Sequence, residues 1–122
     1  MTAKVYYNSA CPVCRAGIEG QRERMQACGA TDVEWIDVHS QPERAAEVGA
    51  PLEAIRERLH VKEADGSIGV GVDAFERLWS RTRGQRWLGA LARLPGLRQL
   101  GQLAYNLFAR WLYRRNRAKG RW

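Results

Sequence analysis

The sequence predicts an α/β fold whose elements follow the order β-α-β-α-β-β-α, with a helical extension after them. Three observations support this prediction. A short β-type run, Lys4–Tyr7, leads directly into a C-x-x-C pair and a helical pattern. Val33–Val38 alternates apolar and polar residues and is rich in strand formers. Asp65-Gly66 stands between two further short β-type runs, which is a strong hairpin signal.

The first half of the chain is predicted to form two parallel strands joined by a helix. A buried strand from Ala3 to Tyr7 precedes a helix from about Pro12 to Cys28, where apolar residues recur at helical spacing. Gly29 is a natural end for this helix. The strand over 33–38 should then lie parallel to the first, joined to it by a right-handed crossover. Cys28 is interpreted as a small buried apolar residue.

The second half of the core is predicted to hold a short helix, a hairpin and another helix. Pro51 is suited to open the short helix, because proline fits the first helical position. The hairpin strands should be 59–62 and 67–70, and a helix should begin near Asp73. Two parallel strands, an antiparallel hairpin and helices on both faces together make the order of the thioredoxin core.

Two amphipathic helices are predicted over about 85–118, separated by Pro95-Gly96. No linker precedes them, so we expect a single domain over 1–122 with a core of about 1–83. The apolar face of the longer helix consists of Leu100, Ala104, Leu107, Phe108, Trp111 and Leu112. The opposite stripe consists of Gln99, Gln102, Asn106, Arg110 and Arg114.

Charge is distributed unevenly along the 122 residues. Residues 81–122 hold 11 Lys and Arg and no acid, whereas residues 1–80 hold 9 Lys and Arg against 13 acids, so the net charge of +7 comes from the C-terminal third. A strongly basic segment of this kind is typical of nucleic-acid binding, of a membrane-surface helix or of a solvated face.

The C-x-x-C pair has the sequence context of a dithiol redox site. Cys11 falls where the first helix should begin, with Pro12 just inside it. Unpaired N–H groups and the helix dipole stabilise a thiolate at this position. We expect Cys11 to be the more exposed, attacking thiolate and Cys14 the more buried, resolving thiol.

Two other interpretations of the pair remain. A structural zinc site needs four ligands, and the remaining candidates are Cys28, His39 and His60. Along a continuous helix Cys28 would lie about 21 Å from Cys14, at ~1.5 Å per residue, so it could not share a metal with the pair. The second alternative is a pair of structural thiols without redox chemistry.

The segment Tyr7-Asn8-Ser9-Ala10-Cys11-Pro12-Val13-Cys14 resembles the N-terminal signature of the DCC-type thiol–disulfide oxidoreductases, a thioredoxin-like family. Further matches extend the resemblance over nearly the whole chain: Leu59-His60-Val61, Asp65-Gly66, Gly71, Ala74, and Tyr105 to Asn116-Arg117. The resemblance implies the same fold and disulfide exchange at the dithiol. The D in the family name stands for an acidic residue, and this chain has Asn8 in its place. A role that depends on the charge of that acid is therefore not transferred to this chain. Asparagine can still form a turn or a cap there.

The supporting residues of the site are predicted to be Asn8, Pro12, Asp37 and His60. Asp37 could move protons for the resolving cysteine, or it could be a surface or capping carboxylate. His60 could lower the pKa of a nearby thiol, or it could be a half-buried strand histidine. Thioredoxins carry a cis-proline before the third strand, and this chain has Arg58-Leu59-His60 in that place.

No phosphate-binding glycine loop and no flavin or nicotinamide site is evident, so we expect neither cofactor nor metal. The electrons should come from another thiol, either a small one resembling glutathione or a partner protein. An odd cysteine count, with no apolar stretch at the start of the chain, favours a cytoplasmic location.

The rival function is a non-catalytic binding module that docks through its basic helices. We expect the first half of the apolar face over 97–117 to pack on the body. Trp111, Tyr113 and the terminal arginines would then contact a membrane surface or an acidic partner. Plain intramolecular packing is the alternative for the whole face, and nucleic acid is the least favoured partner.

Overall fold

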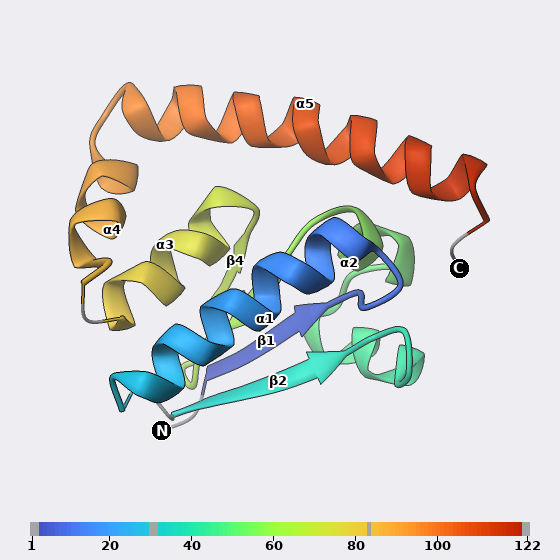
Figure 1. Cartoon of the computed structure of the whole chain (residues 1–122), viewed down its shortest axis with the longest axis horizontal. Helices are drawn as coiled ribbons and strands as arrows, with labels where there is room; N and C mark the ends of the chain where they lie inside the picture. Colours follow the sequence, from blue (N-terminus) through green and yellow to red (C-terminus); the bar gives the residue numbers. More distant parts are fainter. Residues whose placement is uncertain (1–2, 30–31, 83, 121–122) are drawn as a thin grey trace.

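The computed structural model describes residues 3–29, 32–82 and 84–120. Its centre is a four-stranded sheet in the order β2-β1-β3-β4 (Figure 1). The strands are β1 (Ala3–Tyr7), β2 (Val33–Asp37), β3 (His60–Lys62) and β4 (Ile68–Val70). β1 pairs in parallel with β2 and antiparallel with β3, which forms an antiparallel hairpin with β4. The thioredoxin-like arrangement predicted from the sequence is confirmed.

Helices lie on both faces of this sheet. Their bounds are α1 (Pro12–Ala27), the 3-10 helix η1 (Pro42–Val48), α2 (Leu52–Glu57), α3 (Val72–Arg81), α4 (Arg86–Arg93) and α5 (Leu97–Ala118). η1 was not predicted. It begins at Pro42 and is capped after Val48 by Gly49, whose φ of 66° is a left-handed conformation that glycine adopts without strain.

Two apolar cores flank the sheet because successive strand residues face opposite sides. Val5 of β1 faces the core beneath α1 and α3, whose buried members include Ile18, Met25 and Leu78. Its neighbour Tyr6 faces the other core, beneath η1 and α2. The dithiol therefore lies at one end of the first core, at the N-terminus of α1.

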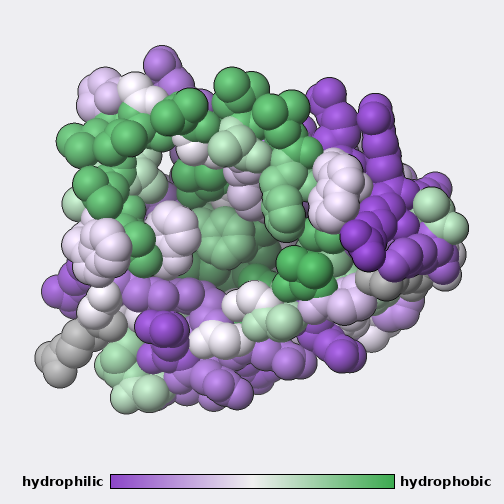
Figure 2. Space-filling view, turned by 45° about the horizontal axis from the view of Figure 1, so that its top comes forward, coloured by the Kyte–Doolittle hydropathy of each residue, from purple (hydrophilic) through white to green (hydrophobic). Residues whose placement is uncertain are grey.

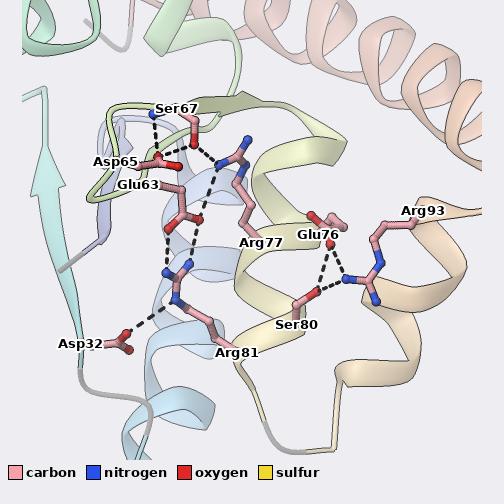
Figure 3. A network of polar contacts seen from close by, with 9 residues as sticks. All are labelled: Asp32, Glu63, Asp65, Ser67, Glu76, Arg77, Ser80, Arg81 and Arg93. Carbon is pink, nitrogen blue, oxygen red and sulfur yellow. Dashed lines mark hydrogen bonds and ion pairs between the residues drawn. The ribbon is translucent and has the colours of Figure 1, made fainter. Parts of the chain in front are cut away.

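A network of ion pairs joins α3 to the elements around it (Figure 3). Arg81 donates to both carboxylate oxygens of Glu63 at 2.8 and 2.6 Å, and its Nε lies 3.7 Å from Asp32. Arg93 of α4 donates to Glu76 of α3 at 3.1 Å. Bidentate arginine–carboxylate pairs fix orientation as well as distance, so α3 holds both the hairpin and α4 in place.

Gly89 allows α4 to approach α3 closely. A Cβ at this position would lie 2.5 Å from the Oγ of Ser80, which is shorter than any normal contact. Tight packing on α3, rather than the conformational freedom of glycine, explains this residue.

The long helix α5 crosses the molecule above α1 and α3 (Figure 1), but its orientation differs from our expectation. Ala109 and Leu112 are buried, whereas Leu107 and Trp111 are 60% and 53% exposed. The side chain of Gln102, from the stripe expected to face outward, instead accepts the Val72 N–H at 3.2 Å.

The prediction that the first half of the apolar face packs on the body is therefore wrong. α5 takes the observed orientation because backbone N–H groups beneath it need acceptors. Gln102 supplies one acceptor and Tyr105 supplies another, to the Leu59 N–H. Turning these polar groups inward leaves the leucine face outside. Within the described residues, α5 and the other helices are too short or too polar to span a bilayer.

Candidate functional site

The N-terminus of α1 is capped by a sulfur atom. Cys11 is the N-cap residue, with an extended backbone (φ −85°, ψ 115°), and Pro12 occupies the first helical turn. The Cys11 Sγ accepts the backbone N–H of Cys14 at 3.3 Å. The two cysteines therefore lie close together at the helix start, and one of the unpaired N–H groups of the first turn points at the Cys11 sulfur.

The relative exposure of the two thiols is the reverse of our expectation. Cys11 is 0% exposed, whereas Cys14 is half-buried. A capping side chain must fold back over the first turn to reach its amide, and this direction leads into the protein. Cys14, one turn later, lies at the wall of a pocket.

Burial holds the thiol of Cys14 in its protonated form. Burial raises the pKa of the Cys14 thiol far above its usual value, and the hydrogen bond with Cys11 raises it further. The Cys14 thiol therefore stays protonated at neutral pH. The Cys11 sulfur accepts the backbone N–H of Cys14, a donor that would also stabilise a thiolate there.

Asp37 anchors the loop between β1 and the dithiol. Its carboxylate accepts the backbone N–H of Ser9 at 3.1 Å, the hydroxyl of Ser9 at 2.6 Å and the backbone N–H of His39 at 2.9 Å. Burial alone would raise the pKa of Asp37, but these hydrogen bonds outweigh it and lower the pKa below its usual value. Asp37 is thus a charged capping carboxylate, the alternative to a proton carrier.

Asn8 forms the tight turn within the same loop. It is buried, and its Oδ1 accepts the Ala10 N–H at 3.1 Å. The Nδ2 group is also buried and has no hydrogen-bond partner among the described residues. This side chain lines the same pocket as Cys14 and brings an unused donor close to the dithiol.

His60 lies on the other side of the sheet from α1. It is the antiparallel partner of Tyr6, and that tyrosine belongs to the core beneath η1 and α2. Its Nδ1 lies 3.0 Å from the carbonyl oxygen of Arg58, and burial lowers the pKa of His60. His60 has the position of a buried strand histidine, the alternative to a role at the thiols.

Tyr105 of α5 completes the site, in a role that the sequence analysis missed. Its hydroxyl accepts the Leu59 N–H at 3.2 Å, at the place where thioredoxins carry their cis-proline. No cis peptide bond occurs in the described parts of the chain. Gly71 makes room for the tyrosine, since a Cβ there would lie 3.0 Å from its ring. The sequence analysis named Tyr105 only as a match to the family, and a partner 46 residues away leaves no local pattern in the sequence.

A pocket of about 220 Å³ opens beside Cys14. Its walls come from α1, the segment joining α2 to β3, and α5, and they are mostly apolar. Figure 2 shows that this side of the molecule is hollowed and that apolar side chains surround the hollow. Among the lining residues are Val13, Cys14, Leu59, Phe75, Tyr105, Phe108 and Leu112. An apolar group next to a reacting sulfur could bind here.

Comparison with known proteins agrees with this geometry. A family model described as DCC1-like thiol-disulfide oxidoreductase matches residues 5–118. An uncharacterised chloroplastic protein of Arabidopsis thaliana is 23% identical over 109 residues, which cover 88% of this chain and 50% of that protein. The chain thus spans about half the length of this curated relative. No solved structure matches.

Proposed function

The chain belongs to the DCC1-like thiol-disulfide oxidoreductase family, and from this premise we propose that it exchanges disulfides through Cys11 and Cys14. The observation that supports the proposal best is the helix cap itself. The Cys11 sulfur accepts the Cys14 N–H at the start of α1, beside a pocket large enough for a side chain. A helix N-terminus lowers the cost of a thiolate.

In the first step the Cys11 thiolate attacks one sulfur of a substrate disulfide. A bond forms between Cys11 and that sulfur, the substrate S–S bond breaks, and the other substrate sulfur leaves as a thiolate that takes a proton from water. In the second step Cys14 loses its proton and attacks the Cys11 sulfur. The Cys11–Cys14 disulfide forms and the second substrate thiol is released, so the substrate gains two electrons and the protein loses them.

The protonation of Cys14 supports this order of events. A thiol whose pKa is raised by burial is a poor first nucleophile, but it can resolve a mixed disulfide once its proton is removed. Cys11 is buried, so we infer that the loop over Asn8–Ala10 shifts when the substrate arrives from the pocket side.

The electrons that restore the dithiol should come from a second thiol, in keeping with the chemistry of the family. The mostly apolar pocket beside Cys14 suits a disulfide flanked by apolar groups, and Arg56, Glu57 and Arg58 in its wall could meet the charges of either a protein substrate or a small thiol such as glutathione. We also propose that the chain folds as one domain and acts in the cytoplasm. The Arabidopsis relative is named as chloroplastic, which concerns that protein alone.

Single cysteine variants test the proposal. Cys11→Ser should abolish reduction of a model disulfide, because the attacking sulfur is gone. Cys14→Ser should instead accumulate a mixed disulfide with the substrate, detectable as an added mass that a reductant removes. Cys28→Ser, which removes the thiol at the far end of α1, should leave the rate unchanged and serves as the control. Full activity in Cys11→Ser would refute the proposal. If the mixed disulfide accumulated in Cys11→Ser and not in Cys14→Ser, Cys14 would be the attacking cysteine and Cys11 the resolving one.

A further inference from the structure

The outward side of α4 and α5 exposes a continuous series of large apolar side chains. We call this surface the docking face. It consists of Trp87, Leu91, Leu94, Leu97, Leu100, Leu103, Leu107, Phe108 and Trp111, all of them exposed. Figure 2 shows apolar side chains gathered over much of this side of the molecule. Exposed apolar surface on this scale marks an interaction site in a folded protein.

The docking face cannot be covered by the body of the chain. At about 100° per residue around a helix, Leu100, Leu107 and Trp111 of α5 lie nearly opposite the residues that contact the body. Those inward residues are Ala109, Leu112 and Tyr105, whose hydroxyl is bonded to Leu59. Burying the leucines internally would break that bond and the bond from Val72 to Gln102.

Three cations near the docking face have no carboxylate partner among the described residues. Arg110, Arg114 and Lys119 form no ion pair with any other described residue. Arg115 lies over the ring of Trp111, with its guanidinium carbon 5.4 Å from the ring centroid. Other cations of α4 and α5 pair with acids of the body, since Arg93 meets Glu76, Arg98 meets Asp73 and Arg117 meets Glu53. The three unpaired cations can meet an external anion.

We propose that the docking face binds the surface of an anionic lipid bilayer, with α5 lying in the headgroup plane. A helix with a leucine-rich side, tryptophans and bordering arginines combines the two signals that stable interfacial binding requires, which are buried apolar area and attraction to anionic headgroups. Tryptophan favours the same depth, where its ring is half in water.

The charges argue against two other occupants. In a symmetric dimer the basic surfaces of two copies would lie against each other, and no acid in this segment could pair with them. Nucleic acid would bind a basic centre, whereas here the centre is leucine and the cations lie at the border. Phe108 belongs both to the docking face and to the wall of the pocket beside Cys14, so binding would bring that pocket close to the bilayer.

Co-sedimentation of the full chain with vesicles tests the proposal. We expect binding to vesicles of phosphatidylcholine mixed with phosphatidylglycerol, little binding to phosphatidylcholine alone, and weaker binding at high salt. Removing two bordering charges, in Arg110→Gln with Arg114→Gln, should lower the partition coefficient about tenfold to thirtyfold, since each cation adds up to roughly fivefold at an anionic surface. The matched control, Arg22→Gln with Arg24→Gln, removes the same charge from exposed positions of α1 and should change little.

A second pair of variants tests the contribution of the apolar side chains to vesicle binding. Leu103→Glu with Leu107→Glu should abolish vesicle binding while the circular dichroism spectrum stays unchanged. Ile68→Glu, an exposed apolar residue on the hairpin, should leave binding intact. Absence of binding to the anionic vesicles would overturn the proposal, as would equal losses in the control variants. A dimer that Leu103→Glu with Leu107→Glu dissociates, without vesicle binding by the parent chain, would assign the face to a second copy instead. None of the substituted residues lines the pocket beside Cys14, so disulfide exchange in solution can be measured separately on the same variants.

Discussion

The hydroxyl of Tyr105 offers a sharp test of how α5 is joined to the thioredoxin-like core. In Tyr105→Phe the ring still packs on Gly71 and Phe75, but the Leu59 N–H loses its acceptor. Leu59 is buried at this site, and burial also raises the pKa of Tyr105. Leaving a buried backbone donor without a partner costs about 1–3 kcal/mol in the free energy of unfolding.

The corresponding shift in melting temperature follows from the size of the chain. The entropy of unfolding is about 2.1 cal/mol/K per residue, or roughly 0.26 kcal/mol/K for a domain of this length. Dividing the loss in free energy by this entropy predicts that Tyr105→Phe melts about 4–12 °C lower. Differential scanning calorimetry measures this shift, and hydrogen exchange should show faster exchange at the Leu59 amide.

Tyr7→Phe is the matched control. Tyr7 lines the same pocket, and its hydroxyl makes no hydrogen bond within the described chain, so removing it should shift the melting temperature by less than about 2 °C. The proposed closure of α5 over Leu59 would be refuted if both variants melted like the parent protein, or if Tyr7→Phe lost as much stability as Tyr105→Phe.

Three further predictions concern single substitutions. Gly89→Ala should lower the free energy of unfolding by about 1–3 kcal/mol, because the new methyl would meet Ser80, whereas Gly20→Ala, in open space on α1, should raise it by roughly 0.5–1 kcal/mol. Urea unfolding of the two variants measures both signs, and equal shifts would contradict the packing of α4 on α3. The pKa of Asp37 is lowered in the folded protein, so its stabilising effect is present at neutral pH and disappears as the pH falls through its usual value of 3.8 and below. Asp37→Asn should therefore be less stable at pH 7 and lose less stability on acidification, and parallel pH profiles would exclude the anchor role. Asn8→Asp would put a carboxylate oxygen in the buried place of the unpartnered Nδ2, and burial should raise the pKa of the new carboxyl. The free energy of unfolding should therefore fall as the pH rises from 4 to 7. A flat pH profile would show that water reaches this place.

The sequence alone determined the order of the elements and the position of the dithiol. Alternation in β2, helical spacing in α1 and α3, and the Asp65-Gly66 hairpin are local patterns, and local patterns fix the type of each element. The capping position of Cys11 is equally local, because a cap is defined by the residues of one helical turn.

Only the tertiary structure decided which sulfur is exposed, which way α5 faces and what Tyr105 does. Each of these depends on partners far away in the sequence. Tyr105 meets Leu59 and Gln102 meets Val72, and satisfying those backbone donors outweighed the burial of the leucine face. Periodicity identifies the two sides of an amphipathic helix, but it cannot say which buried donors a helix must satisfy. The apolar side therefore remained outside, where a partner of different chemistry can cover it.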